Sequence, residues 1–237
     1  MTQFPLNIIQ LDTIDSTNNY MKALLKSGEP LKPYTVVCAR EQTAGRGRQQ
    51  RAWHTEKQNS LCMSLCVPFE GSPSITLLCA LGVHKALQHF CHTPLEIKWP
   101  NDIIAHNRKL CGILTEGVNG YAVIGIGINI NNKVFPSDIA HKATSLHLLT
   151  GDAFSLEETA EKVACSVFEI LEAHHGKADE STLRLYRNLC ANIGRKVVWQ
   201  EKSGVATDID PDGSLVVSFA DKEEKISFGE VTITDIY

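Results

Sequence analysis

The sequence lacks the features that mark a membrane-bound or exported protein. None of its apolar runs reaches the roughly 18 residues that a transmembrane helix requires. Its N-terminus, MTQFPLNIIQLDTIDSTNN, has no basic region followed by a long apolar one. These absences predict a cytoplasmic protein without membrane association. The 237 residues suffice for one large domain, or for one domain with a small appendage.

An excess of positive charge is also missing, because 23 Lys and Arg face 27 Asp and Glu, for a formal net charge of -4. A protein that binds nucleic acid over a broad surface usually shows the opposite balance, so no nucleic-acid partner is expected. Repeats and low-complexity segments are absent as well. A site for an anionic ligand in this chain must therefore be local.

The eight cysteines lack the short paired spacings of a zinc site or of a compact disulfide scaffold. They lie in apolar runs, and we therefore expect buried free thiols in a reducing compartment. No Ser/His/Asp or Cys/His pattern indicates a protein nucleophile. The adjacent His174 and His175 are expected at a helix end, where histidine is favourable. We assign no histidine to a site and no residue to a metal.

Hydrophobic periodicity predicts a mixed α and β protein. Ser16, Thr17 and Asn18 are predicted to cap a helix that ends near Gly28. Ser155 with Glu158 has the pattern of a capping box. The further predicted helices cover about 74–90, 155–174 and 181–189, and the predicted strands cover 35–38, 61–67, 95–99, 110–116 and 121–131.

The sequence pattern changes from Gly194 onward, where short β runs are separated by SG, DPDG and FADKEE turns. This pattern predicts a small β-barrel of about 45 residues. A unit of that size rarely buries enough apolar surface to be stable alone, so we expect it to dock on the preceding domain. The predicted domains are residues 1–190 and 191–237.

The segment EQTAGRGRQQRAW, residues 41–53, holds a local cluster of positive charge. Its arginines are Arg46, Arg48 and Arg51, and its glycines are Gly45 and Gly47. Guanidinium groups suit phosphate or carboxylate oxygens, and glycine lets the backbone approach a ligand closely. Short Gly-rich patterns often match by chance. On this segment alone, two other interpretations therefore stay open: a solvated surface loop and a segment that contacts RNA.

Two predicted strands present a face of small residues. The strand period of two separates the isoleucines of YAVIGIGININN from Gly125, Gly127, Asn129 and Asn131. In SLCMSLCV the small face consists of Ser60, Cys62, Ser64 and Cys66. A bare glycine face needs something close against it, either a packed helix or a ligand. Two such strands predict a slot for a flat ligand.

The segment IKWPNDIIAHNRKLCGIL places Lys98, Asn101, Asp102 and Lys109 around a Pro-Asn turn. Taken singly, Asp102 ends a strand and Lys109 is a solvated hairpin lysine. Taken together, Asp102 can hold a metal-bound nucleotide or orient a lysine, and Lys109 can meet a phosphate. Both interpretations stay open at this point.

Five motifs in chain order resemble the biotin protein ligases. They are DSTNN at 15–19, EQTAGRGRQQRAW at 41–53, KWPNDI at 98–103, RKLCGIL at 108–114 and GIGININ at 125–131. No single block is decisive, but five in register are specific. The resemblance covers residues 8–150 and continues more loosely to the C-terminus. It implies an α+β fold, with a class II synthetase-like mixed sheet flanked by helices and a C-terminal SH3-like β-barrel.

The resemblance also implies which residues form the site. The implied catalytic residues are Arg48, Lys109 and Asp102, of which Asp102 would orient or deprotonate the acceptor lysine. The implied binding residues are Ser16, Thr17, Asn18 and Gln42 for the biotin ring and ureido group, Gly125 and Gly127 beneath the biotin, Asn129 facing the adenine, and Gly45, Arg46, Gly47, Arg48 and Lys109 around the carboxyl and phosphate groups. The family usually reads GRGRxGR, so Gln50 replaces a glycine, and loop mobility and retention of the intermediate are expected to change.

The implied activity uses ATP and Mg²⁺ to convert biotin into biotinyl-5'-AMP. The biotin is then transferred to a lysine of a biotin carboxyl carrier protein, a subunit of acetyl-CoA carboxylase. The mixed anhydride hydrolyses when exposed, and a glycine-hinged arginine loop that closes over it would both bind and cover it.

Two alternatives accompany this interpretation. A lipoate or octanoate protein ligase of the same superfamily would also adenylate a carboxylate, but the KWPND and GRGR blocks favour biotin. A biotin-sensing repressor would bind DNA through an N-terminal winged helix. About 15 residues precede Ser16, so we expect a ligase without DNA binding. The resemblance leaves a homodimer open.

Overall fold

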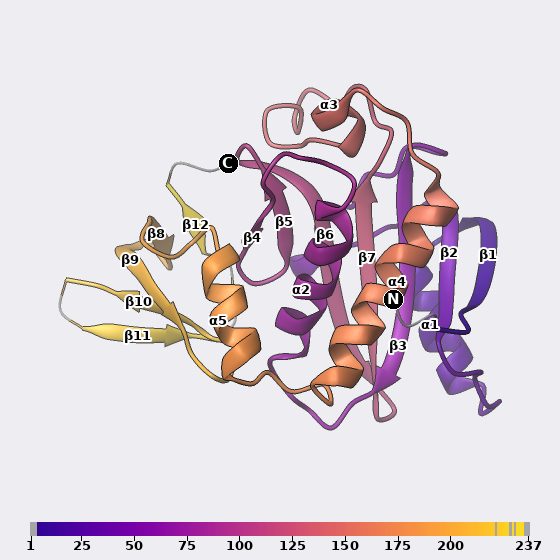
Figure 1. Ribbon diagram of the computed structural model, residues 1–237, viewed down its shortest axis with the longest axis horizontal. Coiled ribbons are helices and arrows are strands. Elements are labelled where there is room, and N and C mark those ends of the chain that lie inside the picture. The colour runs from indigo at the N-terminus through magenta and orange to yellow at the C-terminus, as the bar shows by residue number, and fades with distance from the viewer. Residues whose placement is uncertain (1–3, 221, 228, 230, 235–237) are drawn as a thin grey trace.

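Two β-sheets, with helices packed on the larger one, organise the chain (Figure 1). The computed structural model describes residues 4–220, 222–227, 229 and 231–234. The larger sheet has the strand order β1-β2-β3-β7-β6-β5-β4, in which β1 and β2 are parallel and the other described pairs antiparallel. Its strands are β1 (Asn7–Ile14), β2 (Thr35–Gln42), β3 (Ser60–Pro68), β4 (Glu96–Lys98), β5 (Asp102–Ala105), β6 (Arg108–Val118) and β7 (Tyr121–Asn129).

The helices cover both faces of the larger sheet. They are α1 (Thr17–Lys26), α2 (Ile75–Gln88), α3 (Leu146–Thr150), α4 (Leu156–Ala173) and α5 (Glu180–Leu189), with a short 3-10 turn η1 (Arg48–Gln50). Helix α1 packs on β2, β3 and β7 through Met21, which contacts Val37 and Val123. The neighbouring Val36 belongs to the core on the other side, where α2 and α4 lie. Because successive strand residues point to opposite faces, α1 and α2 lie on opposite sides of the sheet.

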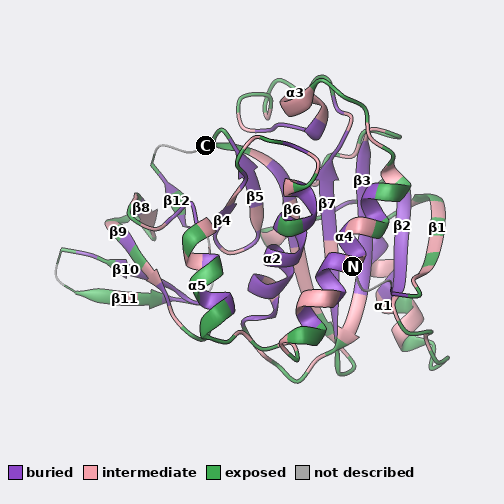
Figure 2. Cartoon of the chain, in the orientation of Figure 1, coloured by how far each residue is buried: buried purple, intermediate pink, exposed green. Residues whose placement is uncertain are grey.

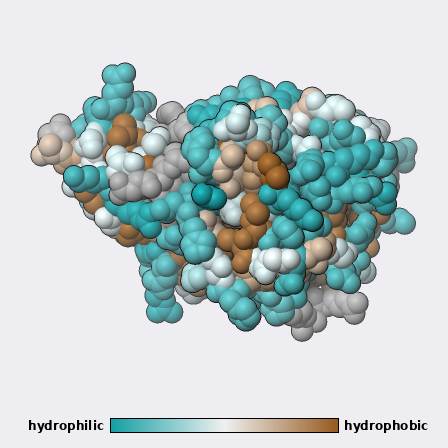
Figure 3. Space-filling model, turned by 90° about the horizontal axis from the view of Figure 1, so that it is seen from above, coloured by the Kyte–Doolittle hydropathy of each residue, from teal (hydrophilic) through white to brown (hydrophobic). Residues whose placement is uncertain are grey.

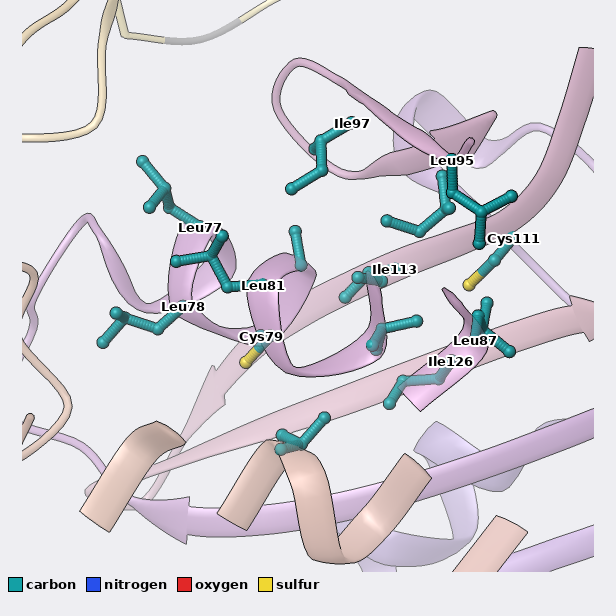
Figure 4. Packing of buried hydrophobic residues seen from close by; sticks show 14 of the residues in the cluster. Leu77, Leu78, Cys79, Leu81, Leu87, Leu95, Ile97, Cys111, Ile113 and Ile126 are labelled. Atoms are coloured by element: carbon teal, nitrogen blue, oxygen red, sulfur yellow. The ribbon is translucent and has the colours of Figure 1, made fainter. Parts of the chain in front are cut away.

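Helix α2 lies at the centre of the main core because it is apolar on nearly every side. The sequence ITLLCALGVHKALQ is covered by the sheet on one face and by α4 on another. Figure 4 shows Leu81 and Leu87 of α2 beside Ile113 of β6 and Ile126 of β7. Buried residues are concentrated in α2, β3 and β7 (Figure 2). In the part of the chain that the structure describes, no helix is long and apolar enough to span a bilayer.

The second sheet docks on this core, as the sequence predicts. Its strands are β8 (Lys196–Trp199), β9 (Lys202–Ile209), β10 (Leu215–Ser218), β11 (Glu223–Ile226) and β12 (Thr232–Ile233), in the order β11-β10-β9-β8-β12. Its buried residues Val197, Ile209 and Leu215 belong to the same hydrophobic cluster as α2. Arg187 of α5 adds an ion pair with Asp208 at 2.6 Å.

The mixed α+β class and the second sheet are confirmed, with one difference in detail. The C-terminal strands were expected to close into an SH3-like barrel. Among the described residues no pairing joins β11 to β12, so the structure has an open five-stranded antiparallel sheet there. The predicted domain boundary after residue 190 falls in the connection between α5 and β8.

Local predictions were partly right. Ser16 is the N-cap residue of α1 but forms no side-chain cap, and Thr17 and Asn18 are already helical. Ser155 does cap α4, because its Oγ accepts a hydrogen bond from Glu158 N at 3.1 Å. The structure places a reciprocal capping box at α5 instead, between Asp179 and Thr182. The strands β1, β5 and β12 and the helix α3 were not predicted. The eight cysteines are free as predicted, but Cys66 and Cys165 are only half-buried.

Gly82 sets the distance between α2 and α4, and its replacement is expected to destabilise the fold. A Cβ at this position would lie 2.7 Å from Val167 Cα, which is backbone and cannot rotate away. We expect Gly82→Val to lower the free energy of unfolding in urea by about 1–3 kcal/mol. Gly117→Val in β6 is the control, because a Cβ there meets nothing within 4 Å. Equal stability of the two variants would contradict the close approach.

Candidate active site

One cavity of about 1010 Å³ collects residues from distant parts of the sequence. It lies along the face of the larger sheet that α1 covers and extends to the C-terminal sheet. All the site residues implied by the resemblance line it except Gly45. A Cβ on Gly45 would lie 2.8 Å from Gln42 Nε2, so this glycine permits a close approach behind the cavity wall. The volume suits a nucleotide together with a small acid.

The small-residue face of β7 forms the floor of the cavity through Gly125, Gly127 and Asn129, whereas the small residues of β3 do not line it. The antiparallel register places Cys62 opposite Gly127 and Ser64 opposite Gly125. The isoleucines of β7 point the other way and are buried in the main core. The two strands are neighbours with their small faces in register, but only the face of β7 lines the cavity, and a slot for a flat ligand between the two stays a prediction.

Two side chains of the protein lie directly on the glycines of this floor. A Cβ on Gly125 would be 2.3 Å from Asn18 Oδ1, and one on Gly127 would be 2.4 Å from Trp53 Cε2. Glycine is needed at both positions because no side chain fits beneath Asn18 and Trp53. A ligand can therefore reach the surface of Gly127 only after the indole of Trp53 moves.

A buried polar cluster closes the α1 end of the cavity. The hydroxyl of Ser64 is a hydrogen-bond donor with two acceptors in reach, Asn18 Oδ1 at 2.6 Å and Thr17 Oγ1 at 2.7 Å. Gln42 Oε1 accepts from the backbone N–H of Thr17 at 2.8 Å. The hydroxyl of Ser16 is not used for capping and lines the cavity. This end offers fixed amide and hydroxyl groups.

Glu116 supports this cluster, although no sequence pattern indicated it. Its carboxylate accepts from Asn18 Nδ2 at 2.8 Å and pairs with Lys22 Nζ at 2.9 Å. Burial raises the pKa of Glu116, but the hydrogen bonds from Asn18 and Lys22 together lower it by more. The pKa of Glu116 is therefore below its usual range. The ionised carboxylate fixes the Asn18 amide with its oxygen toward Ser64.

The arginine loop covers the middle of the cavity. It is closed by backbone bonds from Gly47 N to Arg51 O at 2.8 Å and from Trp53 N to Gly45 O at 2.9 Å. Arg48 donates to Asn101 Oδ1 at 3.2 Å and to Gly229 O at 2.8 Å. It therefore joins the loop to the Pro-Asn turn and to the C-terminal segment at once.

The loop shows why a glycine is usual where this chain has Gln50. Gln49 and Gln50 both have positive φ angles, 54° and 59°. Residues other than glycine adopt this left-handed region at a cost. Gln50 Oε1 accepts a hydrogen bond from Arg46 Nη1 at 3.4 Å, and Arg46 Nη2 donates to Asn19 Oδ1 at 3.3 Å. In this chain a side-chain contact to Arg46 accompanies the strained backbone.

Lys109 and Asp102 lie together, with Lys109 over Gly112 of β6, whereas Asn18 lies over Gly125 of β7. Lys109 Nζ is 2.8 Å from Asp102 Oδ1, an ion pair without the angles of a hydrogen bond, and lies 5.6 Å from the centroid of the Trp53 ring. The side chains are 30% and 17% exposed. Lys109 is thus a cavity residue with partners, and its interpretation as a freely solvated hairpin lysine is wrong.

Asn129 is buried and holds backbone segments together. Its Nδ2 donates to Thr144 O at 2.9 Å and to Lys109 O at 3.4 Å. These bonds fix the connection after β7 against the start of β6. A contact between Asn129 and adenine stays a prediction.

Sequence reasoning missed three groups of lining residues. Trp53 was part of a quoted motif but received no role. The connection between β7 and α3 contributes Val134, which is 78% exposed, with Phe135, Pro136, Ile139 and Lys142. The end of the molecule that carries α3 shows hydrophobic surface among hydrophilic residues (Figure 3). The C-terminal segment contributes Gly229, Val231 and Thr232.

The charges on the lining residues favour a polyanionic ligand. The cationic ones are Arg46, Arg48, Arg51, Lys98, Lys109 and Lys142, and the carboxylates are Glu56 and Asp102. No cysteine is among the described residues that line the cavity. Beneath its floor, burial raises the pKa of Cys62 to about 11, which keeps this thiol protonated and unreactive. The described residues also contain no cluster of three or more His, Cys, Asp and Glu that could hold a metal ion.

Comparison with known proteins identifies the family. Residues 11–131 match the model of the Biotin/lipoate A/B protein ligase family. The chain is 31% identical over 224 residues to a Biotin--[acetyl-CoA-carboxylase] ligase of Paracoccus denitrificans, a match covering 86% of this chain and 90% of that protein. The chain therefore belongs to the biotin/lipoate A/B protein ligase family.

Two further relatives show how far the likeness extends. The Bifunctional ligase/repressor BirA of Bacillus spizizenii is 37% identical over 158 residues, covering 62% of this chain and 48% of that protein. The matched region thus spans about half the length of that relative. The structure of the biotin protein ligase from Aquifex aeolicus in complex with biotin and ATP has a TM-score of 0.85 and 27% identity, covering 97% of this chain and 98% of that one.

Proposed function

We propose that the protein is an ATP-dependent biotin protein ligase. It activates biotin as biotinyl-5'-AMP and transfers the biotin to a lysine of a biotin carboxyl carrier protein, as a biotin--[biotin carboxyl-carrier protein] ligase does. The observation that carries this proposal is a single cavity with a polar end of fixed amide and hydroxyl groups at Asn18 and a cationic end at Lys109. The Aquifex aeolicus relative, whose structure holds biotin and ATP, supports it.

The polar end suits a ureido group, which has two N–H donors and one carbonyl acceptor. The hydroxyl and amide groups of Ser16, Thr17 and Gln42 offer both kinds of partner. The surrounding hydrogen bonds hold these groups in place before a ligand arrives, which limits the entropy lost on binding. Lipoate has no ureido group and would leave these buried polar groups without partners, at a cost in affinity.

The cationic end suits the first half-reaction. The biotin carboxylate attacks the α-phosphorus of ATP, an oxygen–phosphorus bond forms, and pyrophosphate leaves. Negative charge grows on the nonbridging oxygens and on the leaving group, and cationic donors already in position stabilise it. Lys109 and Arg48 border this part of the cavity, so we assign them to this role.

Magnesium fits the same end of the cavity. Mg²⁺ is usually held by one or two carboxylates together with substrate phosphates, rather than by a full protein cage. Glu56 is the lining carboxylate that can contribute in this way, since Asp102 takes part in the second half-reaction. Bound there, the ion would neutralise phosphate charge as pyrophosphate departs.

The second half-reaction needs a deprotonated acceptor lysine. Its amine nitrogen attacks the carbonyl carbon of the mixed anhydride, a carbon–nitrogen bond forms, and the bond from that carbon to the phosphate oxygen breaks to release AMP. A carboxylate near the carbonyl can accept the proton that the nitrogen loses. We assign this role to Asp102, which lies beside Lys109 at the cavity wall.

Exchange of labelled pyrophosphate into ATP tests the proposal, because adenylation is reversible. We expect exchange to depend on biotin. Intact-mass measurement of a carrier domain, incubated with ATP, magnesium and either biotin or lipoate, should then show one added biotin. Exchange with lipoate and not with biotin would assign the chain to the lipoate ligases, and no exchange with either acid would overturn the proposed function.

A further inference from the structure

Strand β4 is an edge of the larger sheet, yet its outward backbone groups have partners. The backbone of an edge strand is normally left open on one side. Here Ile97 O accepts a hydrogen bond from Ala191 N at 2.9 Å, and Trp99 N donates to Asn192 Oδ1 at 2.8 Å. A parallel bridge between Ile97 and Cys190 completes the contact. The chain that leaves α5 therefore acts as an additional partner for this edge.

The amide of Asn192 can bind in only one orientation. The side chain is fully buried, and its Oδ1 must face Trp99 N because both Nδ2 and Trp99 N are donors. The thiol of Cys190 lies 3.9 Å from the same oxygen. In the described part of the chain Nδ2 has no hydrogen-bond partner. A buried donor left unsatisfied is costly, so what this side chain contributes is the bond that Oδ1 accepts from Trp99 N.

Trp99 begins the turn that carries two cavity residues. The turn joins β4 to β5, and Asn101 and Asp102 follow Trp99 and Pro100 directly. Asn101 Nδ2 donates to Ile113 O at 2.6 Å, while its Oδ1 accepts from Arg48. The position of the turn thus determines where Asp102 lies relative to Lys109.

The C-terminal half of the chain holds this turn from two further directions. Trp99 Nε1 donates to Gly213 O at 2.9 Å, in the turn between β9 and β10. The fully buried Tyr186 of α5 places its hydroxyl 3.4 Å from Pro100 O. Among these contacts the bond from Trp99 N to Asn192 is the shortest and involves the backbone next to the turn.

We propose that Asn192 is a positioning residue for the transfer half of the ligase reaction. It holds Trp99, and through Trp99 it sets the position of the Asp102 carboxylate that takes the proton from the acceptor lysine. The inference rests on the proposed function. Asn192 lies outside residues 11–131, the part of the chain matched by the family model. The C-terminal region thereby takes part in the chemistry without touching substrate.

The effect on transfer follows from geometry. Transfer needs three groups in place at the same moment. The acceptor amine must be close enough to attack the anhydride carbonyl, and the carboxylate must be within hydrogen-bonding distance of that amine. A shift of about 1 Å in one group can slow such a step about 100-fold. Lys109 and Arg48 contact the same turn, but they act on adenylation through their charge. A Coulomb interaction falls off gradually with distance, whereas proton transfer to Asp102 needs hydrogen-bonding distance, so a small shift of the turn affects adenylation less than transfer.

The test separates the two half-reactions in Asn192→Ala, Asn192→Asp and a control. Biotin-dependent pyrophosphate exchange measures adenylation, and single-turnover reaction of purified biotinyl-5'-AMP with a carrier domain measures transfer. Ser166→Ala is the matched control, because Ser166 is buried and its Oγ donates to Gly82 O at 2.8 Å, between α2 and α4. Thermal melting reports the stability of every variant.

We expect Asn192→Ala to slow transfer about 10- to 100-fold and to change exchange less than about threefold. Asn192→Asp keeps an oxygen toward Trp99 N and should restore most of the transfer rate. Ser166→Ala should change neither rate beyond its effect on the folded fraction. If Asn192→Ala does not fold, Asn192→Ser takes its place.

Three results would overturn the inference: equal loss of exchange and transfer, loss of exchange alone, or unchanged transfer in a folded Asn192→Ala protein. Each of these leaves the proposed function intact, because the wild-type protein still shows biotin-dependent exchange. Absence of exchange in the wild-type protein would instead remove the proposed function itself.

Discussion

Lys109→Ala is expected to abolish most biotin-dependent pyrophosphate exchange while the protein stays folded. The ammonium group lies in the cavity beside Asp102 and contributes little to the apolar core. Adenylation concentrates negative charge on phosphate oxygens, and one donor aimed at such charge is worth about 2–4 kcal/mol of transition-state stabilisation. The expected loss is therefore about 30- to 1000-fold in kcat/KM for exchange.

A surface lysine with similar geometry serves as the control. Lys85 pairs with Glu169 at 2.8 Å, the same distance that separates Lys109 from Asp102, but its side chain is 57% exposed and does not line the cavity. Exposed pairs contribute roughly 0–1 kcal/mol to stability, so Lys85→Ala should exchange at nearly the wild-type rate. Near-normal exchange by a folded Lys109→Ala protein would leave this lysine with a structural role only.

The parts of the fold that periodicity determines were predictable. The alternation in YAVIGIGININN is imposed by burial of Ile124, Ile126 and Ile128 in the main core, so the sequence pattern directly reports the two faces of β7. The apolar runs of α2 and α4 likewise reflect their coverage on several sides. The small face of β3 could be matched to that of β7 because small and large residues alternate in both strands.

Elements without a strong period were missed. Strand β1 is an edge strand with no fully buried residue. Its positions alternate between half-buried and exposed, but Ile8 is exposed and Asn7 is half-buried, so the residue types do not follow that alternation. Strand β5 has four residues and follows a proline turn, which leaves too short a window for any pattern. Helix α3 has five residues and depends on the cap at Ser145 for its start.

The contacts that connect the site to the C-terminal sheet could not be predicted at all. Gly213 and Gly229 contribute backbone carbonyls to Trp99 and Arg48, and a carbonyl acceptor leaves no signature in the sequence. Trp53 lies on Gly127 because the arginine loop folds back over the floor, which is a tertiary property. Residue types therefore indicated the chemistry of the cavity, while long-range packing decided which groups already occupy it.

Arg48→Gly is expected to weaken retention of biotinyl-5'-AMP more than its formation. Arg48 anchors the loop through two hydrogen bonds, to Asn101 Oδ1 and to Gly229 O. Glycine removes both bonds and adds backbone freedom at the start of η1. Loss of about 2–3 kcal/mol from such charged donors shifts the ratio of closed to open loop by about 30- to 150-fold.

An open loop lets the adenylate dissociate before the acceptor lysine reacts. Free biotinyl-5'-AMP acylates exposed lysines of any protein, so acceptor specificity falls as escape competes with ordered transfer. The measurement is incubation of Arg48→Gly with ATP, magnesium, biotin and serum albumin, followed by detection of biotin on the albumin. Lys109→Ala should not label albumin, because it forms little adenylate.

Arg48→Lys separates the role of the charge from that of the two simultaneous bonds. A lysine keeps the positive charge but lacks the planar fork that reaches two acceptors at once. If retention depends on the anchor, Arg48→Lys labels albumin more than the wild-type protein and less than Arg48→Gly, while its exchange rate stays close to normal. If albumin stays unlabelled although Arg48→Gly still forms adenylate, the loop is not held closed by Arg48. The contact between Gln50 and Arg46 would then be the remaining connection to test, with Gln50→Gly relieving the positive φ angle at that position.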